Sequence, residues 1–293
     1  MVVKVLAELF RKYRKVIGLL LISLVFIAAG GLFYYRWSKA WNQTFAVHFF
    51  DIGQGDAALI RFGNGAKMLV DCGPDRKILS KLGATLPWLD RTIDYLVATH
   101  PDLDHYGGCV DVLRRYQVKR IIVNGRQKSY DPYWREWDNA VKAEGAAVIV
   151  MASPTVWQIA DNTLEFISPD PTLKLAVKED DNNNYSIVFR LARHGQSFLF
   201  TGDAEVPLEQ ALIAKYCAAG CPALRSDVLK VGHHGSGSST SAEWLAAVRP
   251  RQAVISAGKQ NRYGHPSRRV LRRLERSGIV VLRTDTSGDI TIK

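Results

Sequence analysis

The segment THPDLDHYGG at residues 99–108 concentrates side chains that bind metal ions. Four potential ligands fall within six residues: His100, Asp102, Asp104 and His105. Imidazoles and carboxylates are the ligands of divalent metal centres that catalyse hydrolysis. Alternate side chains of a strand point to opposite faces, so a turn must gather the four, and Gly107 and Gly108 are expected to allow it. The segment predicts a metal site, and the alternative is a polar loop whose Asp caps a helix.

Polar residues also end other apolar runs of the chain. Asp71 closes MLVDCG, Asp203 lies in FTGDAE, and His233 and His234 lie in LKVGHHGS. A single carboxylate in such a place is usually a turn residue. Several of them at one rim of the sheets, together with the segment 99–108, predict a shared site.

The spacing of apolar residues predicts the elements that position these side chains. Strands and helices alternate from residue 45 to the end, which favours mixed sheets covered by helices in one large domain. The strands that lead to the candidate residues are expected at 45–51, 57–62, 67–71, 94–100, 196–202, 226–232 and 252–256. Helices are expected near 105–115, 131–144, 206–219, 241–249 and 267–277, and a polar loop at 170–184.

An uncharged run of 20 residues, 16–35, lies between two basic flanks. As a helix rising about 1.5 Å per residue it would span about 30 Å, the thickness of a bilayer core. Five basic residues precede the run, so the positive-inside rule predicts a cytoplasmic flank 1–15, a transmembrane anchor 16–35 and an extracytoplasmic domain 44–293. The alternative is a signal peptide cleaved near residues 28–31, which would release a secreted domain.

The net charge of +11 is unevenly distributed. Residues 1–39 carry +6 and residues 249–283 carry +9, so the rest of the chain is slightly acidic. The C-terminal basic stretch is either a solvated helix face or a surface on which Arg272 and Arg273 contact nucleic-acid phosphates.

The four cysteines form two groups, for which we expect different states. Cys217 and Cys221 flank a short turn and could close a small loop in an oxidising compartment. Cys72 and Cys109 are expected to be unpaired, buried and apolar in behaviour.

Seven motifs, in order, resemble the metallo-β-lactamase superfamily, and within it the hydrolase domain of ComEC-type DNA-uptake (competence) proteins. They are FFDIGQGDA at 49–57, MLVDCG at 68–73, THPDLDHYGG at 99–108, NNYS at 183–186, FTGDAE at 200–205, LKVGHHGS at 229–236 and NRYGHPS at 261–267. The resemblance covers about 45–293 and implies an α/β (α+β) fold, the αββα metallo-β-lactamase sandwich, here preceded by one transmembrane helix. ComEC-type proteins also carry a polytopic channel region, so this chain, with one apolar run, is not expected to be the channel.

The resemblance implies a centre of two divalent metal ions. Its ligands would be His100, Asp102, Asp104, His105, Asp203 and His233, with Asp102 in place of the family's second histidine and Asp203 bridging the ions. The family's middle histidine has no counterpart, because Asn183, Asn184 and Ser186 stand in that region. Oxygen ligands in place of imidazoles favour Mn²⁺ over Zn²⁺.

Other residues are expected to act around the metals. Besides ligating, Asp104 would orient the attacking water, while His234 and His265 would donate a hydrogen bond or a proton to the phosphate or its leaving oxygen. His265 could instead be an ordinary loop histidine. Residues expected to contact substrate or to hold the ligands from behind are Asp51, Gln54, Asp56, Asp71, Asn183, Asn184, Ser186 and Ser236.

These features predict a membrane-anchored, extracytoplasmic, metal-dependent phosphodiesterase or nuclease whose substrate is single-stranded DNA or another nucleic acid. One alternative is a metallo-hydrolase of a different substrate, such as a nucleotide, an envelope phosphoester or a β-lactam. Another is a metal-stabilised binding module in which the missing histidine has abolished turnover. The near-complete ligand set favours an enzyme.

Overall fold

The computed structural model describes residues 2–178, 180–218 and 220–293. It divides the chain into two compact units, Met1–Gln43 and Thr44–Lys293. Among the expected segments, residue 179 of the loop 170–184 and residue 219 at the end of a predicted helix lie outside this description.

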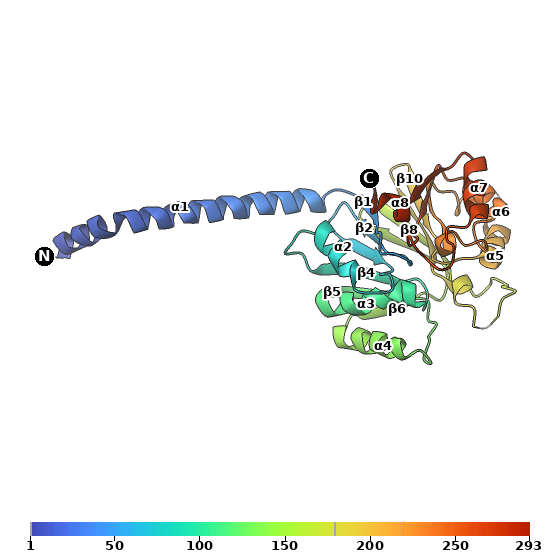
Figure 1. Cartoon of the computed structure of the whole chain (residues 1–293). Helices are drawn as coiled ribbons and strands as arrows, with labels where there is room; N and C mark the ends of the chain where they lie inside the picture. The colour runs from blue at the N-terminus through green and yellow to red at the C-terminus, as the bar shows by residue number, and fades with distance from the viewer. Residues whose placement is uncertain (1, 179, 219) are drawn as a thin grey trace. The chain divides into compact units, whose positions relative to one another are not determined.

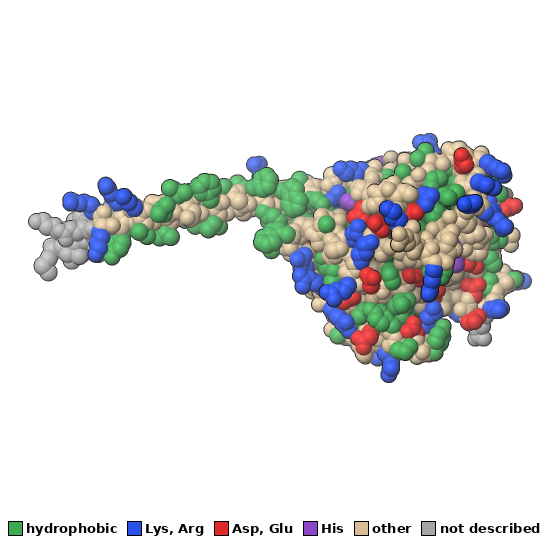
Figure 2. All heavy atoms as spheres, in the orientation of Figure 1, with side chains coloured by type: hydrophobic (Ala, Val, Ile, Leu, Met, Phe, Trp, Pro, Cys, Tyr) green, Lys and Arg blue, Asp and Glu red, His purple; other side chains and the backbone are tan. Residues whose placement is uncertain are grey.

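The first unit is a single long helix, α1 (Val2–Asn42). Its 31-residue segment Arg11–Trp41 is long and apolar enough to cross a membrane, and none of its most apolar window is buried by protein. Apolar side chains run along this helix, with Lys and Arg gathered near its described start (Figure 2). The predicted span 16–35 falls inside this segment, while Met1 and the side chains of residues 2–10 in the predicted basic flank lie outside the described part.

The second unit is built on two seven-stranded sheets. The first contains, in spatial order, β14 (Ile290–Ile292), β1 (Ala46–Phe49), β2 (Ala58–Arg61), β3 (Lys67–Val70), β4 (Thr92–Ala98), β5 (Gln117–Val123) and β6 (Ala147–Val150). The second contains β13 (Val280–Arg283), β12 (Gln252–Ile255), β11 (Val228–Lys230), β10 (Gln196–Phe200), β9 (Val188–Arg193), β8 (Asn162–Ser168) and β7 (Thr155–Ile159). Neighbours are parallel from β3 to β6 and from β13 to β10, and antiparallel elsewhere.

A hydrophobic core fills the space between the two sheets. Because alternate side chains of a strand face opposite sides, Phe198 and Phe200 of β10 join this core, whereas Leu199 packs on the helices outside the second sheet. The rings of Phe189 and Phe200 stack with centroids 4.7 Å apart. The two sheets are therefore packed face to face as one sandwich.

Helices cover the outer faces of the sandwich (Figure 1). Beside the first sheet lie α2 (Lys77–Thr85), α3 (Leu103–Arg115) and α4 (Pro132–Glu144); beside the second lie α5 (Val206–Tyr216), α6 (Ala242–Val248) and α7 (Arg268–Arg276). A short helix, α8 (Thr284–Ser287), precedes β14. These α, β, β and α layers confirm the predicted fold class. Helix α2 and strand β7 were not among the expected elements.

Two glycines of the segment 99–108 have a different role from the expected one. Gly107 and Gly108 lie inside α3, not in a turn before it. A Cβ atom at either position would lie 2.3 Å from a backbone oxygen, that of Pro74 or that of Cys72. The expected turn is therefore wrong, and the glycines instead allow α3 to approach the loop after β3.

This close approach also explains a disulfide bond between Cys72 and Cys109, whose Cα atoms are 5.1 Å apart. The expectation that these two cysteines are unpaired is wrong, because it could not include the contact between α3 and the loop after β3. The bond joins the loop that begins at Asp71 to the helix that carries His105. Cys217 and Cys221 also form a disulfide.

The basic helix α7 buries Val270 and Leu274, as its apolar stripe predicts. Its arginines are not equivalent. Arg272 is exposed, whereas the guanidinium of Arg273 donates hydrogen bonds to the backbone oxygens of Ser239 and Thr240. Arg273 thus binds a loop of the protein, while a contact of these arginines with phosphates stays a prediction.

Candidate metal centre

The candidate site lies where strands of both sheets end. Strands β3 and β4 are parallel, so Asp71 and His100, which follow them, lie at the same edge of the first sheet. Strands β10 and β11 are parallel too, which brings Asp203 and His233 to one edge of the second sheet. The two edges meet, because His105 at the start of α3 reaches Asp203.

Four imidazoles direct their Nε2 atoms at the carboxylate of Asp203. The distances from Nε2 to the nearest Asp203 oxygen are 4.0 Å for His100, 3.2 Å for His105, 3.8 Å for His233 and 3.5 Å for His234. Asp203 itself is buried. A carboxylate surrounded by imidazole nitrogens is typical of a site for divalent metal ions.

The turn after β11 explains how two successive histidines reach one carboxylate. Side chains of successive strand residues point to opposite faces, but His233, His234 and Gly235 all have left-handed backbones, with φ of 47°, 51° and 80°. Such a conformation costs a residue other than glycine about 1–3 kcal/mol and is concentrated at functional sites. It places Nε2 of His234 3.2 Å from Oδ2 of Asp104 as well.

Asp102 occupies the residue before α3, where an Asp usually caps the helix. Its side chain makes no such hydrogen bond. Instead, Oδ1 accepts hydrogen bonds from Lys128 Nζ at 2.6 Å and from Asn182 Nδ2 at 3.3 Å, and Oδ2 lies 3.9 Å from Nε2 of His100. The helix-cap alternative therefore does not describe this carboxylate.

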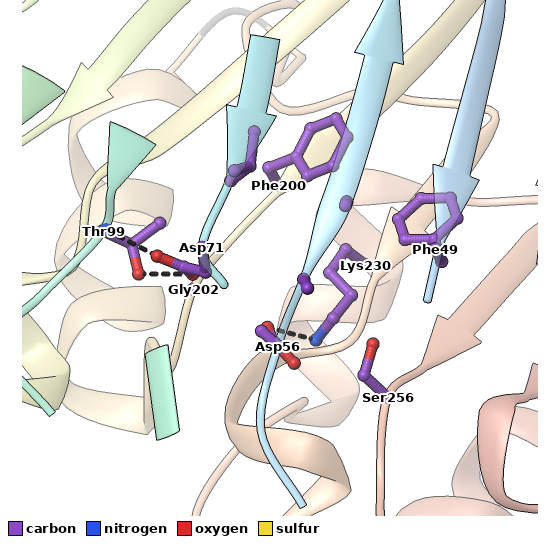
Figure 3. Close-up of a pocket in the computed structure, with 11 residues that line it drawn as sticks. Phe49, Asp56, Asp71, Thr99, Phe200, Gly202, Lys230 and Ser256 are labelled. Atoms are coloured by element: carbon purple, nitrogen blue, oxygen red, sulfur yellow. Dashed lines mark hydrogen bonds and ion pairs between the residues drawn. The ribbon is translucent and has the colours of Figure 1, made fainter. Parts of the chain in front are cut away.

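Asp71 holds His105 from behind. Its Oδ2 lies 2.8 Å from Nδ1 of His105 and accepts a hydrogen bond from the Thr99 hydroxyl, while Oδ1 accepts from the Thr99 amide. Figure 3 shows Asp71 turned toward Thr99 in this way. A carboxylate behind a histidine fixes which ring nitrogen faces a metal.

A buried ion pair holds His234 from behind. Nδ1 of His234 lies 3.1 Å from Asp56 Oδ1 and 3.1 Å from the Ser256 backbone oxygen, and Asp56 Oδ2 lies 2.8 Å from Lys230 Nζ (Figure 3). Asp56, His105, Asp203 and His234 each offer a ligand atom within 4.8 Å of one another. Because both oxygens of Asp56 are already engaged, we place Asp56 behind the centre and not at a metal.

The remaining two histidines are supported in the same manner. Nδ1 of His233 lies 2.7 Å from Oε1 of Glu205, which also accepts from the Ser238 hydroxyl at 2.7 Å. Nδ1 of His100 lies 3.1 Å from the Thr99 hydroxyl and 3.4 Å from the Ser186 hydroxyl. All four imidazoles thus keep Nε2 for the centre.

Buried polar atoms at the centre have no hydrogen-bond partner among the described residues. They are Nε2 of His100, Nε2 of His105 and Oδ1 of Asp203. The last two are 3.2 Å apart, but not in the geometry of a hydrogen bond. Buried atoms without partners are rare in proteins. Divalent cations satisfy the lone pairs of imidazole nitrogens and carboxylate oxygens together, so these residues fit a metal centre.

The charges of the centre are strongly coupled. Burial favours the neutral carboxyl, yet the imidazoles of His105 and His234 hold the pKa of Asp203 well below its usual range. Burial likewise opposes charge on His234, but Asp203 and Asp56 raise its pKa to about 10. Burial, with help from the charge of His105, lowers the pKa of His100. At His234, where the pKa is raised, a proton would compete with a metal ion for the ring nitrogen.

Two predicted residues lie away from the centre. Asp51 accepts a hydrogen bond from the Gly53 amide and lies 3.6 Å from Lys77 Nζ. Asn184 is buried, and its Oδ1 accepts from the backbone amides of Glu205 and Leu208 at the start of α5. Asn184 thus supports the helix after Asp203.

Other predicted residues border the centre. Asn183 Nδ2 lies 3.5 Å from Nδ1 of His233, and the ring of His265 lies 5.5 Å from that of His233. The hydroxyl of Ser236 pairs with that of Ser238. Gln54 Oε1 accepts a hydrogen bond from the amide of Gly258, in the loop that leads to His265.

Three charged residues that the site description includes were not predicted: Lys128, Glu205 and Lys230. Glu205 follows Asp203 in FTGDAE and Lys230 precedes the histidine turn in LKVGHHGS, so both lie inside quoted motifs. A lysine within an apolar strand was a signal for Lys230, since a fully buried lysine is rare without a partner. No comparable signal marks Lys128.

Comparisons with known proteins identify the family of this chain. The model of the family described as "Metallo-beta-lactamase superfamily" matches residues 50–259. The chain belongs to this superfamily. Its members are mostly metal-dependent hydrolases.

The chain is also similar to three curated proteins. It is 34% identical over 261 residues to "ComE operon protein 3" of Bacillus subtilis (strain 168), covering 83% of this chain and 32% of that protein. It is 34% identical over 262 residues to "Competence protein ComA" of Neisseria gonorrhoeae, covering 88% and 33%. It is 32% identical over 256 residues to "Recombination protein 2" of Haemophilus influenzae, covering 86% and 29%. The predicted resemblance is confirmed, and the chain spans about a third of the length of these relatives.

Solved structures share the superfamily fold. CmlA, a diiron β-hydroxylase from Streptomyces venezuelae, matches with a TM-score of 0.55 and 13% identity over 86% of this chain and 54% of CmlA. Zn²⁺-bound PqqB from Methylobacterium extorquens matches with a TM-score of 0.51 and 12% identity over 82% of this chain and 87% of PqqB. At these identities the likeness concerns the fold alone, and the two proteins hold different metals.

Proposed function

We propose that this protein is a metal-dependent phosphodiesterase that cleaves nucleic acid, with single-stranded DNA as its substrate. The observation that carries the proposal is the convergence of four imidazole Nε2 atoms on Asp203, with the carboxylates of Asp102 and Asp104 beside them. The similarity to competence proteins and to a recombination protein supports a substrate connected with DNA.

Besides Asp203, six side chains would serve as metal ligands, in two sets of three. Asp203 would belong to both sets. His100, Asp102 and His233 would hold one divalent ion, and Asp104, His105 and His234 the other. His233 then supplies the imidazole that the family's missing middle histidine would have provided. This allocation replaces the expectation that His234 donates a proton to the substrate, because its side chain is only 1% exposed and its Nε2 faces Asp104 and Asp203.

Two divalent ions held in these sets would polarise a phosphoryl oxygen and lower the pKa of a water molecule. The carboxylate of Asp104 would orient that water as a hydrogen-bond acceptor. Without ions, burial raises its pKa, but the hydrogen bond from His234 and the charge of His105 hold the pKa below its usual range. With ions bound in place of that hydrogen bond, the carboxylate would stay ionised. His265 would donate a hydrogen bond to the leaving oxygen. Its Nδ1 has no hydrogen-bond partner among the described residues, and burial together with the charges of His233 and His234 lowers its pKa, which favours the neutral ring as a hydrogen-bond donor.

The six ligands other than Asp203 include two carboxylates, which favour a hard ion such as Mn²⁺ over Zn²⁺. Asp102 keeps one oxygen for an ion while Lys128 neutralises the other. Such neutralisation lowers the negative charge that an anionic substrate meets at the centre.

Helix α1 would anchor the enzyme in the cytoplasmic membrane, with the N-terminus inside and the folded unit outside. The apolar segment Arg11–Trp41 supports the anchor, and the basic residues at its start support the orientation. The disulfide between Cys72 and Cys109 supports an oxidising compartment for the folded unit.

The test is hydrolysis by the full chain in detergent micelles. With Mn²⁺ or Zn²⁺ present, the protein should cleave bis(p-nitrophenyl) phosphate and single-stranded DNA. Asp104→Asn should reduce turnover by about 10²–10⁴-fold, the range for loss of a positioned acid–base group. Glu243→Gln, on the exposed start of α6, should leave it unchanged. Metal-loaded protein inactive on both substrates would contradict the proposal, and full activity of Asp104→Asn would contradict the site.

A further inference from the structure

The loop between β12 and α7 brings an exposed aromatic ring close to the metal centre. Tyr263 is 55% exposed, and its ring lies nearly parallel to that of His265, with centroids 5.8 Å apart and an interplanar angle of 13°. His265 in turn lies 5.5 Å from the ring of His233, whose Nε2 faces Asp203. A row of three rings thus leads from the surface to the centre.

Hydrogen bonds make this loop rigid. The side-chain amide of Asn261 donates to the backbone oxygens of Gly258 at 2.8 Å and His265 at 2.6 Å, and its oxygen accepts from the amides of Tyr263 at 3.2 Å and His265 at 2.9 Å. Gly258 is fixed in turn by Gln54, because its amide donates a hydrogen bond to Gln54 Oε1. A Cβ atom added at Gly258 would lie only 2.8 Å from the backbone nitrogen of Gln54. Tyr263 is therefore held in place, and binding to its ring requires little ordering of the loop.

A cation accompanies the exposed ring. The guanidinium carbon of Arg262 lies 5.1 Å from the centroid of Tyr263, and Arg262 Nη2 donates a hydrogen bond to the Tyr263 hydroxyl at 3.0 Å. Arg262 is itself exposed. Proteins that bind single-stranded nucleic acid combine these two groups, because the ring stacks on a base while the cation contacts the backbone phosphate.

We propose that Tyr263 is a stacking platform for the nucleobase next to the scissile phosphate, and that Arg262 holds the adjoining phosphate. This inference rests on the proposed phosphodiesterase function and gives a physical reason for its selection of single strands. A base within a duplex is already stacked and paired, so it cannot lie on the Tyr263 ring without being released from its partner.

The platform can be tested by binding, separately from catalysis. Fluorescence anisotropy of the full chain in detergent, with EDTA to prevent cleavage, would measure the Kd of a labelled single-stranded oligonucleotide. Tyr263→Ala should raise this Kd by about 10–100-fold, since base stacking on an aromatic ring contributes that much. Tyr263→Phe keeps the ring and should stay near the wild type, while an abasic oligonucleotide should bind wild type and Tyr263→Ala alike.

Trp88→Ala is the matched control. Trp88 is 68% exposed but precedes β4, whereas the centre follows the other end of that strand. Its replacement should leave Kd unchanged. The platform is contradicted if wild type binds the single strand no more tightly than Tyr263→Ala, or if Tyr263→Ala weakens binding of the abasic oligonucleotide equally. A wild type that cleaves neither DNA nor bis(p-nitrophenyl) phosphate, yet binds single strands through Tyr263, would refute the phosphodiesterase and support the platform.

Discussion

Each imidazole of the centre is held at Nδ1 by a different group. Asp71 supports His105, Asp56 and the Ser256 carbonyl support His234, and Glu205 supports His233. These contacts fix the direction of each ring before any ion arrives. The metal affinity should therefore depend on residues that never touch the ion.

Glu205 offers the clearest test of this dependence. Glu205→Gln keeps the size of the side chain but removes the charge that orients His233, so the affinity for Mn²⁺ should fall by about 10–100-fold. Isothermal titration calorimetry of the full chain would measure it. Glu243→Gln is the control, and equal affinities for the two variants would contradict the role of Glu205.

Lys230 is a buried cation whose partner is the carboxylate of Asp56. Lys230→Met would leave Asp56 buried without its ion pair, which should lower the free energy of unfolding by about 3–5 kcal/mol. Chemical denaturation would measure the loss. Adding Asp56→Asn to Lys230→Met should recover part of it, because no unpaired charge then remains. A double variant less stable than Lys230→Met would show that the ion pair is not the cause.

These residues show which parts of the site can be predicted from the sequence and which cannot. The ligand-type residues could be predicted because imidazoles and carboxylates cluster at strand ends within quoted motifs. Lys230 and Glu205 lie in those motifs too, but their partners, Asp56 and His233, are 174 and 28 positions away in the chain and only the packing of the sheets brings them together. The cooperation of His233 and His234 depends on backbone angles that their residue types do not favour.

At the scale of elements, the contact of α3 with the loop after β3 is fixed by a disulfide and by two glycines. The periodicity of α3 predicts its helix, but not the neighbour against which its glycines pack. Most strands were predictable from their apolar runs, whereas α2 is only nine residues long and β7 buries only one of its five residues.

Removing the Cys72–Cys109 disulfide should destabilise the folded unit. The bond closes a loop of 37 residues, and the double variant Cys72→Ala/Cys109→Ala should lose about 2–4 kcal/mol in free energy of unfolding. The Cys217–Cys221 bond closes a loop of four residues, so its double variant should lose less. Urea unfolding of the two variants would compare them. Equal losses would show that loop closure does not account for the effect.

Two neighbouring arginines of helix α7 have different roles: one is structural and the other is solvated. Arg273→Ala should lower the free energy of unfolding by about 1–3 kcal/mol, because the buried carbonyls of Ser239 and Thr240 lose a donor. Arg272→Ala should change it by less than about 0.5 kcal/mol. If Arg272 contacts a phosphate, its replacement should also reduce the salt dependence of DNA binding by about one counterion. An unchanged salt slope would restrict α7 to a solvated face.

At the scale of the whole molecule, the sandwich could be predicted because seven motifs occur in the order of the superfamily. The positive charge of the chain, like its structure, divides into two parts. One basic region lies before the apolar part of α1, and the other includes α7 and the loop of Tyr263. In the proposed function, the first would set the orientation in the membrane and the second would contact the substrate.

The proposed topology predicts that the protein remains in the membrane pellet after alkaline carbonate extraction. Protease added outside spheroplasts should degrade the folded unit, while a tag fused to the N-terminus should resist until the membrane is opened. Replacing the basic residues Arg11, Lys12, Arg14 and Lys15 by Gln should weaken this orientation. Recovery of the folded unit in the soluble fraction, beginning after Gly30, would instead indicate signal cleavage.

The turn formed by His233, His234 and Gly235 has a consequence for how this centre can change during evolution. Both proposed ion sites draw a ligand from the same few peptide units, so a deletion or insertion there would disable the two together. A descendant could more easily lose one ion through its other ligands, at Asp102 or Asp104. Mononuclear descendants of this centre would therefore be expected to keep the turn intact and to differ at the start of α3.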